Sequence, residues 1–348
     1  MKIIFLTRLF FPSIGGVQKH VLEISQRAIK NKHEVTIITE KHLKKLKNFE
    51  CFKKIKIYRI PIKKQEKKIK KFRIWFWLIK NREIFKGASF IHAHDVGFWI
   101  FPLKFFFPKK AFYITFHGYE PDYYKRNKFK KKLIGAMSNG SIAIGSYLKR
   151  WYKIKPTIIS YGAATLTKFP LGQNQKHIFD ACFAGRLEKD TGIEEYLKAI
   201  KFLQRKYKIK INLVVCGNGH LLKKVKRYTK KSNLSVKFVG WTNNPYRYIA
   251  RSKMMFSSQY LSIIEAAQMK KMIFSIYNTD IKKDYLLDLP IAKKISISNN
   301  YIQLAESIKS FIEHPGRYKK MIAGSYDWAS RQTWSKLYKE YLSLWKNK

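Results

Sequence analysis

The residue of this sequence best suited to bind an anion stands directly after a predicted strand. An apolar run at 178–183 has the pattern of a buried strand, and Gly185 and Arg186 follow it where the chain turns towards a helix. Ligands of a parallel sheet bind outside the carboxyl ends of its strands, and a guanidinium group there can hold a phosphate through two hydrogen bonds. The alternative is a surface ion pair between Arg186 and a nearby carboxylate.

Glycines follow other predicted strands in the same way. Gly15 and Gly16 precede the first predicted helix, and Gly217 follows an apolar run that ends at Cys216. Amide groups at a helix N-terminus favour anions and glycine allows a close approach, although a tight turn needs glycine without any ligand. The first pair is not part of a G-x-G-x-x-G pattern, so we do not expect a nicotinamide dinucleotide.

The segment from Ser262 to Glu265 has two interpretations. The Ser-x-x-Glu pattern is typical of a capping box, in which Glu265 reaches back to the amide of Ser262. The other interpretation is a carboxylate that accepts hydrogen bonds from ribose hydroxyl groups, beside amides that hold a diphosphate. The spacing alone does not separate them.

Histidines follow two further predicted strands. His117 ends one strand and precedes Gly118, a position that favours polar recognition, although a purely structural histidine fits as well. His92, His94 and Asp95 follow another strand at a spacing that permits a metal site. Since no further cluster of ligands supports it, we predict neither a metal nor a cofactor.

The strands that must position these residues alternate with helical segments in both halves of the chain. In the first half, the predicted strands are Ile3–Leu6, Glu34–Thr39, Ile55–Ile60, Phe90–Ala93, Phe112–Phe116 and Ser141–Ile144. In the second half, they are Ile178–Phe183, Ile211–Cys216, Val236–Val239, Met254–Ser257 and Met272–Ile276. A segment rich in Gly and Pro at 156–172 interrupts the alternation. The pattern predicts two doubly wound α/β domains.

The composition limits the classes of partner. The formal charge of +50, from 72 Lys and Arg against 22 Asp and Glu, favours nucleic acid, anionic lipid or a phosphorylated substrate. A compositional bias towards Lys, Ile, Phe, Asn and Tyr explains the charge equally well. Three scattered cysteines fit a reducing cytosol, and residues 1–11 have the pattern of a strand rather than a signal peptide.

Several of these motifs occur together in an order that resembles the GT-B glycosyltransferases of family 4. The motifs are Gly15-Gly16, Thr115-Phe116-His117-Gly118, Gly185-Arg186-Leu187, Gly217-Asn218-Gly219 and Ile264-Glu265-Ala266. The resemblance implies two Rossmann-like domains facing across a cleft. Residues 1–165 would bind the acceptor, residues 166–325 would bind a nucleotide-sugar, and 326–348 would form a helix packed back on the first domain.

The resemblance also implies roles for individual residues. His117 would be catalytic, contacting the transferred sugar near the reacting carbon. The donor would be bound by Gly15, Gly16, Arg186, Lys189, Gly217, Leu261, Ser262 and Glu265. Within this set, Arg186 would bind the diphosphate, the amides of Leu261 and Ser262 would face phosphate, and Glu265 would hold the ribose.

The sequence departs from the family pattern at two positions. Thr191 stands where the family has a lysine before the glycine, and Lys189 is the nearest substitute for that charge. Ser257 stands where the family has an acidic residue that orients the sugar. These departures leave the identity of the sugar open and put activity in question.

The expected function is therefore retaining, metal-independent transfer of a sugar from a UDP- or GDP-sugar to a glycan or lipid-linked acceptor, in the synthesis of a cell-surface polysaccharide. One alternative is another enzyme on the same fold, such as a sugar-nucleotide epimerase. A second alternative is a basic nucleic-acid-binding protein, which would bind nucleic acid in a salt-sensitive manner without binding nucleotide-sugars. No known nucleic-acid-binding module is present in the sequence, so we expect no nucleic-acid partner.

The basic and aromatic segment Lys63–Arg82 predicts an amphipathic helix. Its apolar arc comprises Ile69, Phe72, Trp75, Phe76 and Ile79. Such a helix could dock a cytoplasmic protein on the anionic inner face of the plasma membrane. The alternative is a core helix whose lysine side chains extend to solvent.

Overall fold

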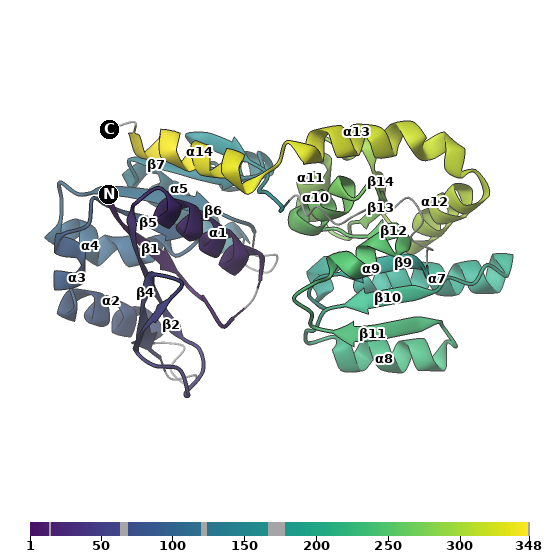
Figure 1. The fold of residues 1–348 in the computed structure, drawn as a ribbon, viewed down its shortest axis with the longest axis horizontal. Coiled ribbons are helices and arrows are strands. Elements are labelled where there is room, and N and C mark those ends of the chain that lie inside the picture. Colours follow the sequence, from purple (N-terminus) through teal and green to yellow (C-terminus); the bar gives the residue numbers. More distant parts are fainter. Residues whose placement is uncertain (14, 63–68, 120–123, 166–177, 347–348) are drawn as a thin grey trace. The chain divides into compact units, whose positions relative to one another are not determined.

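The computed structural model describes residues 1–13, 15–62, 69–119, 124–165 and 178–346 (Figure 1). The chain divides into two compact units. The first unit combines Met1–Gly162 with Trp334–Lys348, and the second unit is Ala163–Thr333. Within the described residues, no helix is long and apolar enough to cross a membrane.

The first unit is built on an eight-stranded sheet in the order β3-β4-β2-β1-β5-β6-β7-β8, parallel except for the β3–β4 pair. Its strands are β1 (Lys2–Thr7), β2 (Glu34–Lys41), β3 (Phe49–Phe52), β4 (Ile55–Pro61), β5 (Phe90–His94), β6 (Ala111–Phe116), β7 (Gly140–Ile144) and β8 (Ile158–Ser160). Residues 3–6 of β1 are fully buried, as expected for a central parallel strand covered on both faces.

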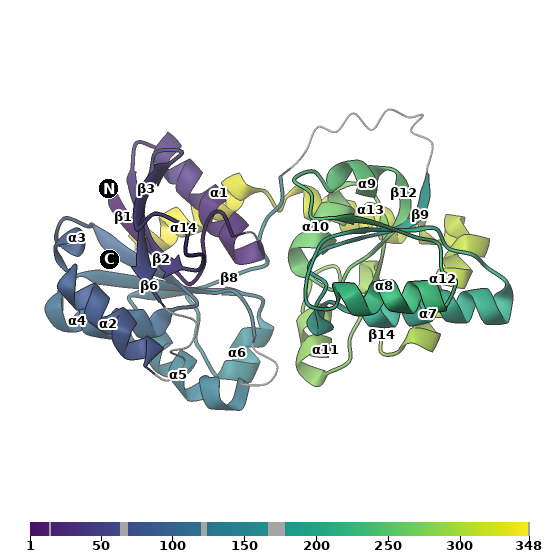
Figure 2. The ribbon, with the colours of Figure 1, turned by 90° about the horizontal axis from the view of Figure 1, so that it is seen from below.

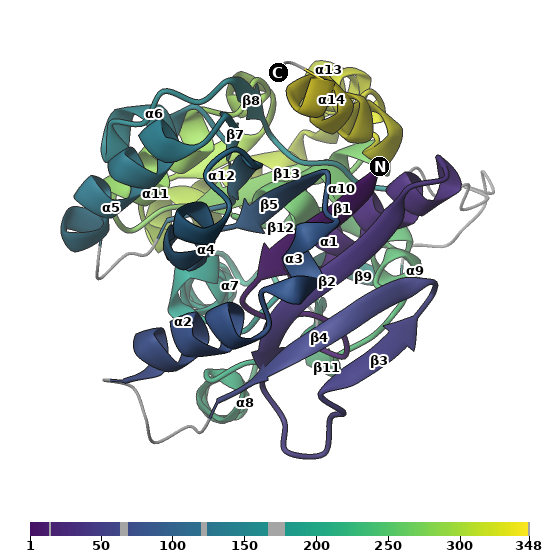
Figure 3. The same cartoon turned by 90° about the vertical axis from the view of Figure 1, so that its left-hand side faces the viewer.

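Helices flank this sheet. They are α1 (Gly16–Lys30), α2 (Lys70–Lys80), α3 (Glu83–Lys86), α4 (Ile100–Phe106), α5 (Tyr124–Met137), α6 (Tyr147–Tyr152) and α14 (Trp334–Lys346), with a 3-10 turn η1 (Gly97–Trp99). Helix α14 packs against α1, and α2 packs against α4 (Figure 3).

The second unit is built on a six-stranded parallel sheet in the order β11-β10-β9-β12-β13-β14. Its strands are β9 (Phe179–Ala184), β10 (Leu213–Cys216), β11 (Val236–Gly240), β12 (Ser252–Phe256), β13 (Met272–Ile276) and β14 (Ser296–Ser298). Its helices are α7 (Ile193–Tyr207), α8 (Leu222–Lys231), α9 (Tyr246–Ala250), α10 (Tyr260–Gln268), α11 (Asp280–Leu287), α12 (Tyr301–Glu313) and α13 (Lys319–Ser330), with 3-10 turns η2 (Lys189–Thr191), η3 (Ala292–Lys294) and η4 (Pro315–Tyr318).

The core of the second unit forms where α7 and α12 cover one face of the sheet (Figure 2). Leu197, Ile200 and Leu203 recur at helical spacing on α7 and are buried there. Burial of each such side chain contributes about 1.5–3 kcal/mol. Strand order reverses beside β9, and it reverses beside β1 in the first unit. The prediction of two doubly wound α/β domains is confirmed.

The end of the chain differs from the expected single helix over 326–348. Helix α13 ends at Ser330 and packs against α10 of the second unit, whereas α14 begins at Trp334 and belongs to the first unit. Near the interruption between α13 and α14, the side-chain amide of Gln268 donates a hydrogen bond to the carbonyl oxygen of Ala329 at 3.0 Å. The chain therefore passes between the units at 333–334, and not at 325–326.

Candidate functional site

Three loops after neighbouring strands form a hydrogen-bonded platform in the second unit. The amide of Gly185 donates to Cys216 at 3.0 Å, and the amide of Leu187 donates to Asn218 at 3.0 Å. The amide of Gly217 donates to Gly240 at 2.7 Å. A Cβ atom on Gly217 would lie 1.8 Å from the carbonyl oxygen of Gly185, so this glycine is required for the close approach of two loops.

Arg186 stands on this platform, just beyond the carboxyl end of β9. Its guanidinium group donates to Asp190 at 3.1 Å, and its side chain is 57% exposed. The surface ion pair that the sequence left as an alternative is therefore present, but it occupies only part of the guanidinium fork. Lys189 is exposed and forms no ion pair with any residue that the structure describes.

The segment after β12 lies next to this platform, because β12 pairs directly with β9. Helix α10 begins at Tyr260 with Gln259 as its N-cap, so Ser262 is the third helical residue. The capping-box interpretation is therefore wrong, since Ser262 would have to be the N-cap. The first amides of a helix have no intrahelical acceptor, which leaves those of Leu261 and Ser262 suited to an anion.

Glu265 lies one turn further along α10 and is buried. Its carboxylate accepts a hydrogen bond from the hydroxyl group of Tyr246 at 2.9 Å. A buried carboxylate oriented by a phenol is able to accept further hydrogen bonds from hydroxyl groups of a ligand. The second unit thus holds Arg186, two helix amides and Glu265 at the carboxyl ends of adjacent strands.

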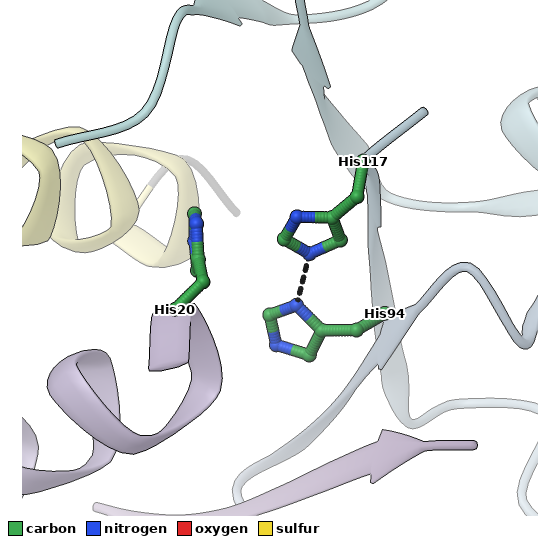
Figure 4. A group of neighbouring side chains, drawn as sticks. All are labelled: His20, His94 and His117. Atoms are coloured by element: carbon green, nitrogen blue, oxygen red, sulfur yellow. Dashed lines mark hydrogen bonds between the residues drawn. The ribbon is translucent and has the colours of Figure 1, made fainter. Parts of the chain in front are cut away.

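The first unit contains a cluster of histidines (Figure 4). His94 at the end of β5 and His117 just after β6 share a hydrogen bond of 2.8 Å between Nδ1 and Nε2. The ring of His20, from α1, meets the ring of His117 edge to face at 4.6 Å. His20 was not predicted from the sequence, because its place on the apolar face of a helix is typical of a core residue. Gly15 and Gly16 begin the same helix.

One nitrogen from each of these three histidines lies within 4.8 Å of the other two, a spacing that could hold a metal ion. In this structure, hydrogen bonds join His94 to His117 and His20 to Tyr341. Burial lowers the pKa of His20 and His94 well below the usual range. Burial and the Lys131 ammonium group lower the pKa of His117 to about 3. All three rings are therefore neutral near pH 7.

The final helix fixes the tautomer of His20 through a chain of hydrogen bonds. An indole N–H can only donate, and that of Trp345 lies 3.0 Å from Nδ1 of His92. His92 therefore carries its proton on Nε2 and donates it to Thr115 at 2.8 Å. Thr115 donates to Tyr341 at 2.7 Å, and Tyr341 donates to Nε2 of His20 at 2.8 Å. With the hydrogen bonds running in this direction, the hydroxyl protons of Thr115 and Tyr341 both have an acceptor.

A similar argument assigns the pair of His94 and His117. Nε2 of His94 is buried and has no hydrogen-bond partner among the described residues. A buried N–H without an acceptor is rarer than a bare lone pair, so the proton of His94 lies on Nδ1 and is donated to His117. Since Nε2 of His117 is the acceptor, this ring carries its own proton on Nδ1 and can donate it to a ligand.

The structure places the predicted site residues in two groups. The first unit contains Gly15, Gly16 and His117, and the second unit contains Arg186, Lys189, Gly217, Leu261, Ser262 and Glu265. Within the second unit, the structure brings together Arg186 and the start of α10, whereas Lys189 points to solvent.

Comparison with known families gives two matches that together span most of the chain. The model for Glycosyltransferase Family 4 matches residues 14–158, and the model for glycosyl transferases group 1 matches residues 168–328. An uncharacterized glycosyltransferase of Methanocaldococcus jannaschii is 26% identical over 259 residues, which cover 65% of this chain and 66% of that protein.

Solved structures share the fold over nearly the whole chain. Sucrose-phosphate synthase from Thermosynechococcus elongatus has a TM-score of 0.78 and 14% identity, over 99% of this chain and 98% of the other. Anabaena HepE in complex with UDP and glucose has a TM-score of 0.70 and 14% identity, over 99% of each chain. At these identities, the structures are similar to this chain in fold.

Proposed function

We propose that this chain, which belongs to the GT-B glycosyltransferases, transfers a sugar with retention from a UDP- or GDP-sugar to a glycan or lipid-linked acceptor, without a divalent metal. The family 4 model matches its first part, and the group 1 model matches its second part. One observation carries the proposal. Strands β9 and β12 are neighbours in the sheet of the second unit, and Arg186 follows one of them while α10, which carries the buried Glu265, follows the other.

This arrangement suits the donor part of the reaction. Negative charge grows on the diphosphate as the bond to the sugar breaks, while the sugar becomes oxocarbenium-like. Arg186 and the amides of Leu261 and Ser262 would stabilise that charge, and Glu265 would accept hydrogen bonds from the ribose. The complex of Anabaena HepE with UDP and glucose supports a nucleotide-sugar as the donor class.

The first unit would supply contacts to the sugar and the acceptor. The Nδ1–H group of His117 would donate to a hydroxyl group of the transferred sugar, and the amides of Gly15 and Gly16 would lie near the diphosphate or the sugar. Because His117 is neutral, its contribution would be orientation through a hydrogen bond and not a positive charge.

A thermal-shift screen against UDP- and GDP-sugars would identify the donor. Transfer from that donor to a glycan or lipid-linked acceptor would then be followed by proton NMR of the new anomeric centre. We expect the product to keep the anomeric configuration of the donor. Inversion of that configuration would contradict the retaining mechanism. Slow release of nucleotide in the absence of an acceptor would indicate that water hydrolyses the nucleotide-sugar.

We further propose that the protein works at the cytoplasmic face of the plasma membrane, on precursors of a cell-surface polysaccharide, and docks there through α2. Residues 63–68 of the predicted amphipathic segment lie outside the described residues. Within α2, Ile74 and Leu78 are buried, whereas Phe72 and Phe76 are 65% and 68% exposed. Two exposed aromatic rings among basic side chains are suited to an anionic interface.

The surroundings of α2 extend this surface. Ile69 is exposed just before the helix, and Phe105 is 81% exposed at the end of the neighbouring α4. Trp75 is anchored to the protein instead, because its indole N–H donates to the carbonyl oxygen of Phe98 at 2.9 Å. A lipid-linked acceptor would make docking of this surface useful, since it would bring the enzyme to its substrate.

A further inference from the structure

Lys282 occupies a position that is unfavourable for a cation. It lies in the first turn of α11, where the positive end of the helix dipole disfavours an ammonium group, and only 3% of the residue is exposed. Its Nζ atom donates to the carbonyl oxygen of Ser258 and lies 4.3 Å from the centre of the Tyr285 ring. It forms no salt bridge with any carboxylate in the described part of the chain. A buried lysine normally has such a partner.

The surroundings of Lys282 join it to the proposed donor site. Ser258, which holds its ammonium group, belongs to the loop between β12 and α10. The same residue borders the loop that carries Arg186, because a Cβ atom on Gly192 would lie 3.6 Å from the hydroxyl oxygen of Ser258. The ammonium group is thus close to both elements that face the diphosphate in the proposed function.

Charged groups on the Arg186 loop act on Lys282 directly. Burial lowers the pKa of the Lys282 ammonium group to about 7, the Asp190 carboxylate acts to raise that pKa, and the Arg186 guanidinium group acts to lower it further. The ring of Tyr285, on the same helix, also faces the ammonium group. In the free protein, burial and the nearby Arg186 guanidinium group thus both disfavour the protonated form of Lys282, and a bound polyanion would favour it.

The loop after β9 that carries Arg186 provides, among the residues that the structure describes, no second cation next to Ser258. The side chain of Thr191 is buried, and its hydroxyl group donates to the carbonyl oxygen of Glu188 at 2.7 Å. Lys189 is exposed. We propose that Lys282, reaching in from α11, binds the diphosphate of the donor together with Arg186. This inference rests on the proposed function, and it names a binding residue that was not predicted from the sequence.

The two cations would act differently. Arg186 presents a planar fork that can hold two oxygen atoms of one phosphate, whereas an ammonium group is a point charge that can turn from the Ser258 carbonyl towards a phosphate oxygen. Contact with the diphosphate would raise the pKa of Lys282. Above pH 7, nucleotide binding should therefore be accompanied by uptake of a proton.

Calorimetric titration of the full-length protein with UDP and GDP tests this inference. Titrations at about pH 8 in buffers of different ionisation enthalpy measure the number of protons taken up. We expect proton uptake by the wild type. We expect Lys282→Met to bind roughly ten- to a hundredfold more weakly and to lose that uptake, since a charge-assisted contact in a desolvated site is removed. The exposed neighbour Lys283 gives the matched control Lys283→Met, which should behave as the wild type.

The outcomes separate this inference from the proposed function. Nucleotide binding by the wild type without proton uptake, or equal affinity and equal uptake in Lys282→Met, would overturn the role of Lys282 and leave the proposed function intact. Failure of the folded wild type to bind either nucleotide would overturn both. Near-ultraviolet circular dichroism checks the fold of the variant. Lys282→Gln provides a second replacement, and an absence of proton uptake by the wild type would overturn the role of Lys282 even if neither variant folds.

Discussion

Arg186 and Lys189 stand three residues apart, yet only Arg186 lies on the hydrogen-bonded platform after β9. We therefore predict that Arg186→Ala weakens nucleotide binding and sugar transfer far more than Lys189→Ala. Loss of a charge-assisted contact should cost about 1.5–3 kcal/mol, a factor of roughly ten to over a hundred. Calorimetry and the rate of transfer provide the measurements. Equal activity of Arg186→Ala and the wild type would show that the diphosphate lies elsewhere.

Tyr341 is the residue through which the final helix reaches His20. Replacement by Phe leaves the hydroxyl group of Thr115 without an acceptor and Nε2 of His20 without a donor. We predict a loss of about 1–3 kcal/mol in the free energy of unfolding, and a change in the tautomer of His20. Urea unfolding measures the first, and long-range proton–nitrogen NMR spectra of the histidine rings report the second.

The same helix offers a matched control for this prediction. The hydroxyl group of Tyr338 is buried and has no hydrogen-bond partner among the described residues. Tyr338→Phe should therefore leave the tautomer of His20 unchanged and should cost little stability. An unaltered His20 spectrum in Tyr341→Phe would refute the chain of hydrogen bonds, whatever its effect on stability.

At the scale of elements, the exposed face of α2 gives a prediction for membrane binding. Phe72→Ser combined with Phe76→Ser should reduce co-sedimentation with phosphatidylglycerol vesicles, and Lys71→Glu with Arg73→Glu should make the remaining binding weaker. Each basic residue near an anionic surface contributes about 1 kcal/mol. Phe129→Ser, on α5, removes an equally exposed ring from another helix and is the control. Indifference of the wild type to lipid charge would exclude this surface.

The strands were largely predictable, because buried parallel strands give short apolar runs between turn residues. The buried faces and the first residues of the helices were harder to predict from the sequence. In α2, apolar residues occur on every side, so the pattern could not show that Ile74 and Leu78 are the buried pair. In α10, Ser262 matched a capping pattern that the Tyr260 start of the helix excludes. Short edge strands such as β3 and β14 were missed, since few of their residues are buried.

The candidate site was predictable where a residue directly follows a strand, as Arg186 and His117 do. It was not predictable where a side chain reaches the site from a distant helix. Lys282 is one of many lysines, and nothing in its local sequence distinguishes it from Lys283. His20 likewise has the spacing of a core residue. Only the tertiary structure brings such residues to the ends of the strands.

At the scale of the whole molecule, the buried histidines predict a protein that loses stability in mild acid. Burial lowers the pKa values of His20, His92, His94 and His117 in the folded state, whereas the unfolded chain has the ordinary value of 6.5. Below pH 6.5, the unfolded chain binds more protons, so the free energy of unfolding falls as the pH falls. The contribution approaches about 1.4 kcal/mol per histidine for each pH unit once the pH lies well below 6.5.

Urea unfolding at about pH 7 and about pH 5.5 measures this effect, in a range where ordinary carboxylates stay ionised. Salt concentration is held constant, because the net charge of +50 makes the folded state sensitive to screening. We expect a clear loss of stability at the lower pH. Burial raises the pKa values of the Asp95 and Glu340 carboxyl groups, which act in the opposite direction but are outnumbered by the four histidines. Equal stability at the two pH values would contradict the burial of the four histidines.

The central claim is that the protein binds a nucleoside diphosphate through Arg186, Glu265 and the first amides of α10, with no divalent metal. Calorimetric titration with UDP and with GDP in the presence of EDTA tests it most directly, with Arg186→Ala alongside the wild type. We expect at least one nucleotide to bind in EDTA, and to bind at least about tenfold more weakly to Arg186→Ala. A folded protein that binds neither nucleotide, while it binds nucleic acid in a salt-dependent manner, would contradict the claim.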